Sequence, residues 1–296
     1  MVKRSVGSTK LKERAARLLF MLSASAAILA VGLICLFLFL RGLPAMAEIG
    51  FFNFLLGRDW RPTSQPPATP QFGILPMIVG SLYVTAGAII IGVPIGLFTA
   101  VFMAEICPKP VYTVLKPVIN LLAGIPSVVY GYFGMVIIVP LIREHVGGQG
   151  FSLLAASVIL GIMVLPTIVS VTETSLRAVP RELYEGAVAL GASHERSVFR
   201  VIFPAAKSGT LSAVVLGIGR AIGETMAVTM VAGNQTVLRA PHQFLMGVRT
   251  LTANVVMEMR YAHGMHEEAL IATGVVLFVF VMIINLCFSL LRKESK

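Results

Sequence analysis

Six apolar stretches, each long enough to cross a lipid bilayer, constrain this 296-residue chain more than any other feature. They cover about residues 18–40, 74–103, 114–140, 151–173, 207–232 and 268–291. A bilayer-spanning helix needs roughly 20 mainly apolar residues, because its backbone polar groups must be satisfied within the segment. Since 56% of the residues are hydrophobic and 13% are charged, an ordinary soluble domain is excluded. The sequence predicts an all-α, polytopic membrane protein with six transmembrane helices.

We expect one membrane domain with short tails. Residues 1–17 form an N-terminal tail, and residues 18–73 form the first span and an external loop. The main domain covers residues 74–291 and includes a long loop at 177–207, and residues 292–296 form a C-terminal tail. The first span is too long for a signal peptide and has no small-residue cleavage pattern before Arg41, so it is interpreted as an anchor and not as a cleaved signal peptide.

The distribution of Lys and Arg predicts the orientation in the membrane. Six spans place both ends of the chain on one side, and that side carries 16 of the 24 basic residues. The opposite loops carry seven, and Arg220 lies inside a span. The positive-inside rule therefore predicts that both termini are cytoplasmic. Because the basic residues flank spans and no nucleic-acid motif is present, the net charge of +10 does not indicate nucleic-acid binding.

Arg220 and Glu224 stand in the middle of the apolar stretch from 204 to 233. Each charge costs about 2.5–3.5 kcal/mol at the centre of a spanning helix, so the two side chains must be hidden from lipid. On a continuous helix, residues four apart share a face and can pair. Gly219 and Gly223 fit a small-xxx-small contact with a neighbouring helix. The pair is either a structural ion pair or part of a transport path.

Signs of metal, cofactor or catalytic chemistry are weak. Cysteines 35, 107 and 287 lack metal or disulfide spacing and are interpreted as apolar fillers. His263, His266, Glu267 and Glu268 lie close together, but they are interpreted as a solvated loop. No nucleophile stands at motif spacing from a base. We expect no catalytic residue, no metal and no cofactor in this chain.

The loop from 177 to 207 has the pattern of two short helices. Pro180 opens an amphipathic helix that ends at Gly191, and Pro204 ends a second short helix before the next span. The first helix can present an apolar stripe of Leu183, Ala187 and Leu190. A loop so ordered suggests either a docking surface for a cytoplasmic partner or a helix lying on lipid.

This loop resembles the EAA loop of type I ABC importer permeases. The family pattern is Glu-Ala-Ala, a glycine, nine residues, then an aliphatic residue, any residue, leucine and proline. Glu185, Ala187, Gly191 and Pro204 match it in register, and the chain departs from it at Gly186, Val201 and Phe203. The resemblance implies a type I importer core of the MetI-like fold.

Two further stretches, Gly124–Gly131 and Gly219–Thr229, resemble the PstC family of phosphate-importer permeases. This resemblance runs from about Trp60 to the last span. It implies a multi-pass inner-membrane subunit that passes phosphate across the bilayer. It also implies a PstA-like sister permease, two copies of a cytoplasmic ATPase that performs the hydrolysis, and a periplasmic phosphate-binding protein.

The resemblance also implies roles for individual residues. The expected ATPase-coupling residues are Glu185, Gly186, Ala187, Gly191 and Pro204. The expected translocation residues are Arg220, Glu224, Ser127 and Thr225. Ser127 follows Pro126 inside the third predicted span, where the proline should kink the helix and the serine could satisfy a freed carbonyl.

Two alternatives stay open. The same fold could carry another oxyanion such as sulfate or molybdate, although the stretch around Arg220 argues against it. A secondary transporter or channel that needs no ATPase is the other alternative. Such a protein would not need a coupling loop, and folds of that class usually have internal repeats.

Overall fold

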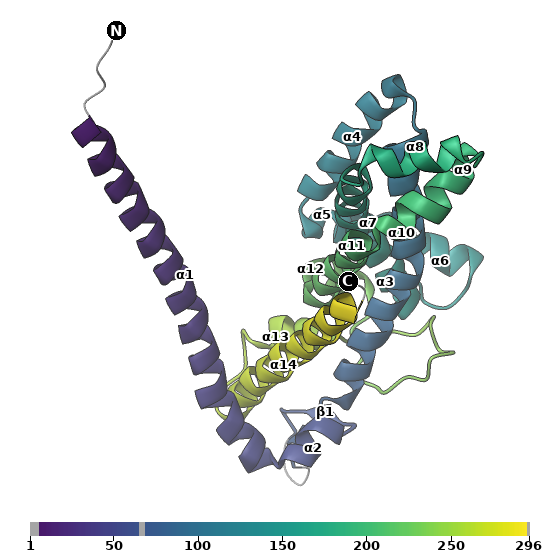
Figure 1. Ribbon diagram of the computed structural model, residues 1–296. Helices are drawn as coiled ribbons and strands as arrows, with labels where there is room; N and C mark the ends of the chain where they lie inside the picture. Colours follow the sequence, from purple (N-terminus) through teal and green to yellow (C-terminus); the bar gives the residue numbers. More distant parts are fainter. Residues whose placement is uncertain (1–5, 65–68, 295–296) are drawn as a thin grey trace.

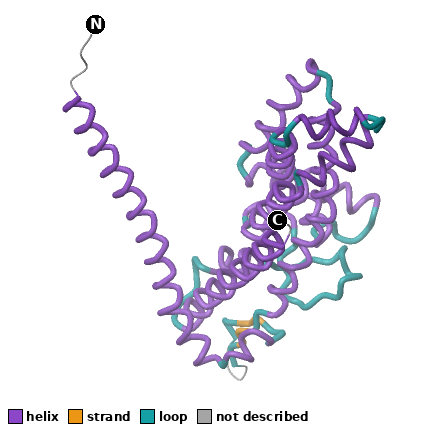
Figure 2. Tube along the Cα trace, in the orientation of Figure 1, coloured by secondary structure: helices purple, strands orange, loops and turns teal. Residues whose placement is uncertain are grey.

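The computed structural model of the chain describes residues 6–64 and 69–294, which are mostly helical (Figure 1; Figure 2). The main helices are α1 (Val6–Ile49), α2 (Phe51–Leu56), α3 (Leu75–Val101), α4 (Lys109–Gly124), α5 (Ser127–Phe133), α6 (Val139–His145), α7 (Leu153–Arg177), α8 (Arg181–Ala189), α9 (His194–Ser197), α10 (Phe203–Ala205), α11 (Lys207–Gly223), α12 (Met226–Val231), α13 (Leu251–Glu258) and α14 (Met265–Glu294). The π-helical turns are η1 (Phe102–Ile106), η2 (Gly134–Ile138) and η3 (Val198–Ile202). One antiparallel hairpin pairs β1 (Trp60–Arg61) with β2 (Gln71–Phe72).

The membrane-spanning character of the chain is confirmed. Five described segments are long and apolar enough to cross a bilayer, or up to six when a bent pair counts as one span. The bent pair joins residues 194–205 to α11 at an angle of 70°. The helix that contains the first span, α1, continues past residue 40 to Ile49 without interruption.

The third predicted span, 114–140, is wrong in its bounds. The membrane-length segment is Ser127–His145, and the residues before it form the separate helix α4. The chain is not helical at Ile125 and Pro126, which have extended backbone angles. Proline disfavours a helical conformation in the residue before it, so the break follows the local sequence. The predicted kink at Pro126 is confirmed, but it separates two helices.

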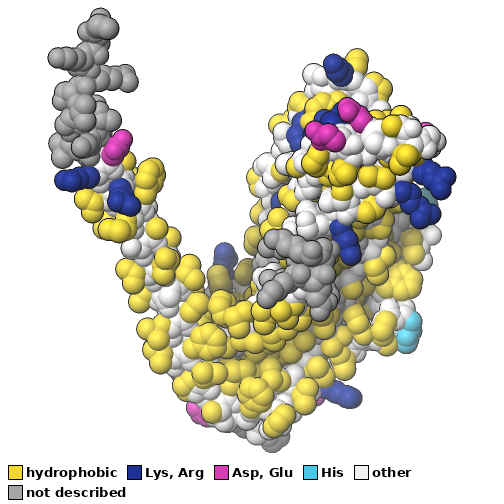
Figure 3. All heavy atoms as spheres, viewed as in Figure 1, with side chains coloured by type: hydrophobic (Ala, Val, Ile, Leu, Met, Phe, Trp, Pro, Cys, Tyr) yellow, Lys and Arg dark blue, Asp and Glu magenta, His cyan; other side chains and the backbone are white. Residues whose placement is uncertain are grey.

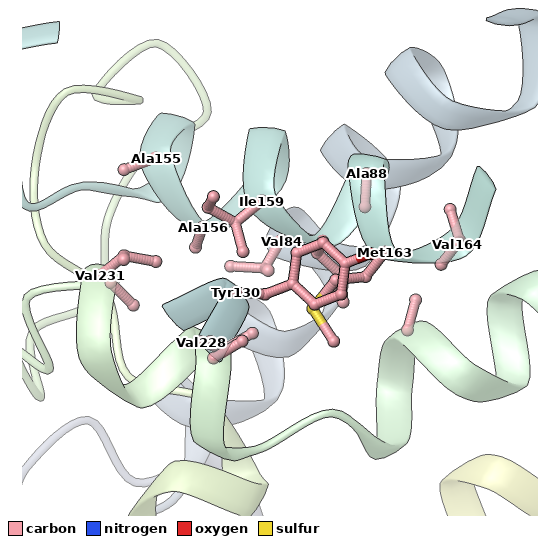
Figure 4. Close-up of a cluster of buried hydrophobic side chains, with 14 of the residues drawn as sticks. Val84, Ala88, Tyr130, Ala155, Ala156, Ile159, Met163, Val164, Val228 and Val231 are labelled. Atoms are coloured by element: carbon pink, nitrogen blue, oxygen red, sulfur yellow. The ribbon is translucent and has the colours of Figure 1, made fainter. Parts of the chain in front are cut away.

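The core lies where α3 and α7 pack along each other and α5, α11 and α12 close around them. In Figure 4 the Tyr130 ring lies among side chains from these elements, including Val84, Met163 and Val228. Glycines allow the close approach of α3 and α7, since a Cβ at Gly92 would lie 2.9 Å from a backbone oxygen of Gly161. The core therefore rests on tight packing between helices.

Helix α1 stands apart from this core. It packs against α14 near its C-terminal end, where Phe39 and Phe278 make an edge-to-face contact, and the two helices then diverge (Figure 1). None of the most apolar 18-residue window of this span is buried within the chain. Figure 3 shows apolar side chains along α1 and over the middle of the bundle. Such a surface is stable only against lipid or other protein.

A buried polar cluster fastens the β1–β2 hairpin to the ends of α13 and α14. The Glu258 carboxylate accepts hydrogen bonds from Trp60 Nε1 and from the Arg249 guanidinium, and it lies 2.8 Å from His266 Nε2. Trp60 is 5% exposed. Trp60 therefore anchors this part of the external loop to the helix ends.

Replacing Glu258 with alanine should destabilise the protein by about 3–5 kcal/mol, because removal of one partner leaves a buried charge uncompensated. The charge concerned is the Arg249 guanidinium, whose side chain is only 13% exposed. Thermal unfolding of the detergent-purified protein would show the loss. Glu267→Ala, at an exposed carboxylate near the start of α14, is the matched control and should melt like the original chain. Equal melting temperatures of the Glu258→Ala and Glu267→Ala variants would contradict this role for the cluster.

Candidate functional site

The fifth predicted span is broken close to Arg220. Helix α11 ends at Gly223, Glu224 has an extended backbone with φ −72° and ψ 128°, and α12 begins at Met226. The predicted continuous helix over 207–232 is therefore wrong in its middle. Discontinuous helices of this kind commonly form the substrate sites of transporters, because their unwound backbone and helix ends can face a path.

The predicted Arg220–Glu224 pair is not formed. Arg220 Nη1 instead donates to the hydroxyl of Thr167 on α7, at 3.2 Å. The Glu224 carboxylate accepts the backbone N–H of Ala227 at 3.2 Å and so caps the first turn of α12. Pairing between residues four apart needs a continuous helix, and this helix ends at Gly223. Among the ion pairs of the described residues, none places a carboxylate on Arg220.

Two threonines satisfy carbonyls that the break leaves free. Thr225 Oγ1 donates to the carbonyl of Gly223, and Thr252 Oγ1 from α13 donates to the carbonyl of Glu224, both at 3.3 Å. A free carbonyl is costly within a membrane, so these bonds stabilise the unwound backbone. The observed contact of Thr225 is therefore local to the break.

The second break, between α4 and α5, carries Ser127 as the first residue of α5. The freed carbonyl of Leu122 accepts a hydrogen bond from the Tyr130 hydroxyl at 2.9 Å. The expectation that Ser127 would satisfy such a carbonyl is therefore wrong, because Tyr130 is long enough to reach back across the break. Within the described chain no side-chain hydrogen bond of Ser127 is formed.

The two breaks belong to helices that pack against each other. Helix α5 lies on α12, and a Cβ at Gly131 would come within 2.9 Å of the Ala227 Cα. The residue before each short helix is Pro126 for α5 and Thr225 for α12. The structure thus brings Ser127 and the Glu224–Thr225 break, nearly 100 residues apart in the sequence, to neighbouring elements.

Gly219 and Gly223 do not make the expected contact within this chain. A Cβ built on either glycine meets no atom within 4 Å. By contrast, a Cβ built on Gly217 would lie 3.0 Å from the side chain of Ile168 on α7. The side of α11 that carries Gly219 and Gly223 is therefore open, and α7 packs on another side of the same helix.

The loop from 177 to 207 contains the helix that the sequence predicts. Helix α8 starts after Pro180, and Gly191 has a φ of +85°, which a residue with a side chain adopts at a cost. No residue of α8 is buried, and Glu185 is exposed without a bonded partner in the described chain. Leu190 is 92% exposed. The helix therefore presents both charge and apolar surface outward.

The rest of the loop agrees with the prediction around Pro204 to within one residue. The helical segment 194–205 ends at Ala205, directly after this proline. The turn toward α11 comes at Ala206, where the backbone angles are φ −85° and ψ 6°. Pro204 therefore lies just before the 70° bend.

Two contacts order the loop internally. The Tyr184 hydroxyl of α8 lies 2.9 Å from Nδ1 of His194 on α9. The Ser193 side chain caps α9 by accepting the N–H of Arg196. The backbone N–H of Glu195 and the Ser193 hydroxyl hold the pKa of the Glu195 carboxyl below its usual value, so this group is charged at neutral pH. These contacts hold α8 and α9 in a fixed arrangement within the loop.

The sequence profile described as "Binding-protein-dependent transport system inner membrane component" matches residues 92–293, from the middle of α3 to the end of α14. The chain belongs to this family. Its members are transport permease subunits, and the multi-pass character of this chain agrees with that. Helix α1 lies outside the matched region.

Relatives of this permease family include the probable ABC transporter permease protein YqgH of Bacillus subtilis, which is 38% identical over 94% of this chain and 88% of its own length. The phosphate transport system permease protein PstC of Mesorhizobium japonicum is 34% identical over 86% and 82%. A solved MetNI methionine ABC transporter chain matches with a TM-score of 0.61 and 21% identity, over 75% of this chain and 96% of that one. A bacterial alginate ABC transporter chain matches with a TM-score of 0.65 and 15% identity, over 97% and 98%. The two structures support the MetI-like fold.

The structure also reveals two residues that the sequence analysis did not single out, the buried carboxylate Glu173 and the Arg220 partner Thr167. Glu173, the last residue of the predicted fourth span, is 1% exposed and bonded to Lys116. An acidic residue at the edge of an apolar run was the available signal. Thr167, the partner of Arg220, carried no comparable signal, because a lone threonine in an apolar helix is ordinary.

Proposed function

We propose that this chain is the permease subunit of an ATP-driven importer of inorganic phosphate in the inner membrane. The observation that carries the proposal is the half-buried Arg220 guanidinium, held against α7 by the neutral Thr167 hydroxyl and paired with no carboxylate among the described residues. The likeness to phosphate transport permeases over most of the chain supports the substrate.

Arg220 supplies a transient phosphate site in this proposal. A guanidinium presents several N–H donors in a planar fork that matches the oxygens of phosphate. Among the described residues, only the Nη1 atom of Arg220 is engaged, in a bond to a hydroxyl, so the other donors can turn to an anion. A site of this kind suits passage better than storage, since a substrate that binds tightly would not leave the path.

Glu224 limits the strength of that site. Glu224 lies four residues beyond Arg220, and the Ala227 N–H holds its carboxylate at the start of α12. A fixed negative charge near the path opposes an anion and keeps its binding weak. Thr225 and Ser127, one at each break, complete the proposed path.

The loop 177–207 couples this path to the ATPase in the proposal. Glu185, Gly186 and Ala187 lie on the outward-facing helix α8, and Gly191 ends it. The ATPase pair would seat this helix, and its closure would move α11 through the segment that contains Pro204 and the bend at Ala206. ATP hydrolysis then belongs to the partner chains, and this subunit supplies no catalytic group.

The orientation follows from the same assembly. Lys109 and Lys116 lie on α4, which sits at the end of the bundle that carries α8 and α9 (Figure 1). Many Lys and Arg side chains also gather at that end and near the start of α1 (Figure 3). We place this end and both termini in the cytoplasm. The sister permease and the periplasmic phosphate-binding protein complete the importer.

The proposal is tested by uptake of radiolabelled phosphate in bacteria that lack their own phosphate permease subunits. This chain is expressed together with its sister permease, ATPase and binding protein. We expect saturable phosphate uptake that requires this chain and an ATPase competent for hydrolysis. Labelled sulfate and molybdate should not be taken up above background.

Other outcomes would contradict the proposal in separable ways. Uptake of sulfate or molybdate in place of phosphate would show that the fold serves another oxyanion. Phosphate uptake that persists with a hydrolysis-deficient ATPase would indicate a secondary transporter. Absence of any uptake, with all subunits present in the membrane, would reject the importer itself.

A further inference from the structure

A buried carboxylate near the cytoplasmic end of α7 takes no part in the path proposed above. Glu173 Oε1 accepts hydrogen bonds from the Tyr112 hydroxyl at 2.7 Å and from Arg177 Nε at 2.9 Å. Glu173 Oε2 accepts from Lys116 Nζ at 2.6 Å. The Glu173 side chain is 2% exposed, whereas those of Lys116 and Arg177 are 29% and 46% exposed.

Arg177 extends this cluster to a third element. Its Nη2 donates to the carbonyl of Met103 in the π-turn η1, at 2.9 Å, and its guanidinium lies 4.6 Å from the centre of the Tyr112 ring. The π-turn continues α3. One carboxylate therefore ties together α4, α7 and the end of α3.

Helix α4 is attached to the bundle through its contact with α7 at the Glu173 cluster. None of its residues is buried, and it packs against α7. The apolar part of the contact is made by the half-buried side chains of Tyr112, Leu115 and Ile119 on α4. They pack against Ala100, Met103 and Val169. The opposite side of α4 is exposed, as Leu121 shows with 71% exposure. The Glu173 cluster and these apolar contacts together connect α4 to α7, and this connection is called the α4–α7 joint.

The joint stands between the coupling loop and the helix breaks. Arg177 is the last residue of α7, and α8 begins four residues later at Arg181. At its other end, α4 leads through the break at Pro126 to α5, which packs on α12. A displacement of α8 that pulls on α7 therefore reaches α4 through this joint, and α4 lies directly before the first break.

We propose that Glu173 is a positioning residue that makes α4 move together with the end of α7, so that movement of the coupling loop reaches the α5–α12 breaks. The inference rests on the proposed function, because it assumes that α8 is moved by an ATPase. A contiguous network can transmit coupling when its elements shift between two arrangements. The ion pairs hold α4 and α7 in one register in both arrangements.

Glu173→Gln tests this role without a large defect in folding. Glutamine keeps the shape and can still accept hydrogen bonds, but it removes the charge that holds two cations. Lys116 and Arg177 are partly exposed, so they can be solvated when the carboxylate is gone. The expected loss therefore falls on the transmission of movement and not on assembly.

The measurement uses the complete transporter in proteoliposomes and compares phosphate imported with ATP hydrolysed. In Glu173→Gln we expect the complex to assemble and to hydrolyse ATP at nearly the original rate. The phosphate imported per ATP should fall about tenfold, within the usual range of coupling between sites. Glu144→Gln, at an exposed carboxylate of α6, is the matched control and should leave the ratio unchanged.

A second readout does not depend on phosphate. An environment-sensitive fluorophore is attached to Leu121→Cys on the exposed side of α4, in a chain whose cysteines 35, 107 and 287 are replaced by serine. With the original Glu173, ATP should change the emission of the probe. In Glu173→Gln the change should be lost. A responding probe without phosphate import would reject the proposed substrate and keep the inference.

Two results would overturn the inference. One is an unchanged ratio of phosphate to ATP together with an unchanged probe response in Glu173→Gln. The other is a probe that stays silent when Glu173 is present, since α4 would then not move. If Glu173→Gln does not assemble, Lys116→Gln removes the α4 side of the same pair at a half-exposed position and should give the same loss of coupling.

Discussion

Arg220→Ala should reduce phosphate uptake at least about tenfold while the protein reaches normal levels in the membrane, because a hydrogen bond to a charged group contributes about 1.5–3 kcal/mol. The side chain removed is the half-buried cation next to the break at Gly223, and it is bonded only to Thr167 in the described chain. Initial rates of radiolabelled phosphate uptake, with this subunit quantified in the membrane, provide the measurement. Arg143→Ala, at an exposed position on α6, is the matched control and should transport normally.

Two further variants separate a phosphate contact from a packing contact. Lysine keeps the charge of Arg220 but lacks the planar fork, so Arg220→Lys should recover little of the uptake if the oxygens of phosphate are bound by that fork. Thr167→Val removes the observed partner of Arg220 and leaves the guanidinium in place. If Thr167→Val is as harmful as Arg220→Ala, the arginine acts by holding α11 against α7. Normal uptake by Arg220→Ala would exclude both roles.

Glu185→Ala should uncouple transport, with uptake reduced at least about tenfold while the complex still assembles, as expected for a side chain central to an interface. Glu185 is exposed on α8 and has no bonded partner in the described chain, so its loss costs this chain no contact of its own. The effect must then come from a partner that binds the helix. Phosphate uptake and stimulation of the ATPase by the binding protein, both measured on the purified complex, would show it.

Gly191→Val should act in the same direction by another route. Gly191 has a φ of +85°, and a β-branched residue in that conformation costs about 1–2 kcal/mol, so the turn after α8 would be displaced. Glu182→Ala is the matched control for the loop, since this exposed carboxylate lies on α8 outside the resembling pattern. Uptake at the original level in Glu185→Ala and Gly191→Val would show that the loop is not the coupling element.

Local sequence was sufficient for much of the fold. The length of the apolar stretches predicts membrane-spanning helices, because about 20 residues are needed to cross the bilayer. Lipid offers the backbone no hydrogen-bond partner, so these residues must bond within a helix. Pro126 predicts a kink, and the structure breaks the helix there. Pro180 and Gly191 predict the start and end of α8. Proline restricts the backbone angles at the start, and glycine permits the positive φ after the end.

Tertiary structure decided how the charged side chains are used. The i, i+4 spacing of Arg220 and Glu224 predicted a pair, but the helix ends at Gly223, and Thr252 on α13 donates a hydrogen bond to the carbonyl of Glu224. Periodicity along a segment says nothing of a hydroxyl supplied by another element.

The same reason applies to Glu173, whose partners Lys116 and Tyr112 lie 57 and 61 residues away. Apolar length is a property of each segment alone, and the sequence therefore determined that this chain spans the membrane several times. Burial of a carboxylate depends on which helices meet around it, and only their packing decided that α4 is fastened to α7 at this residue.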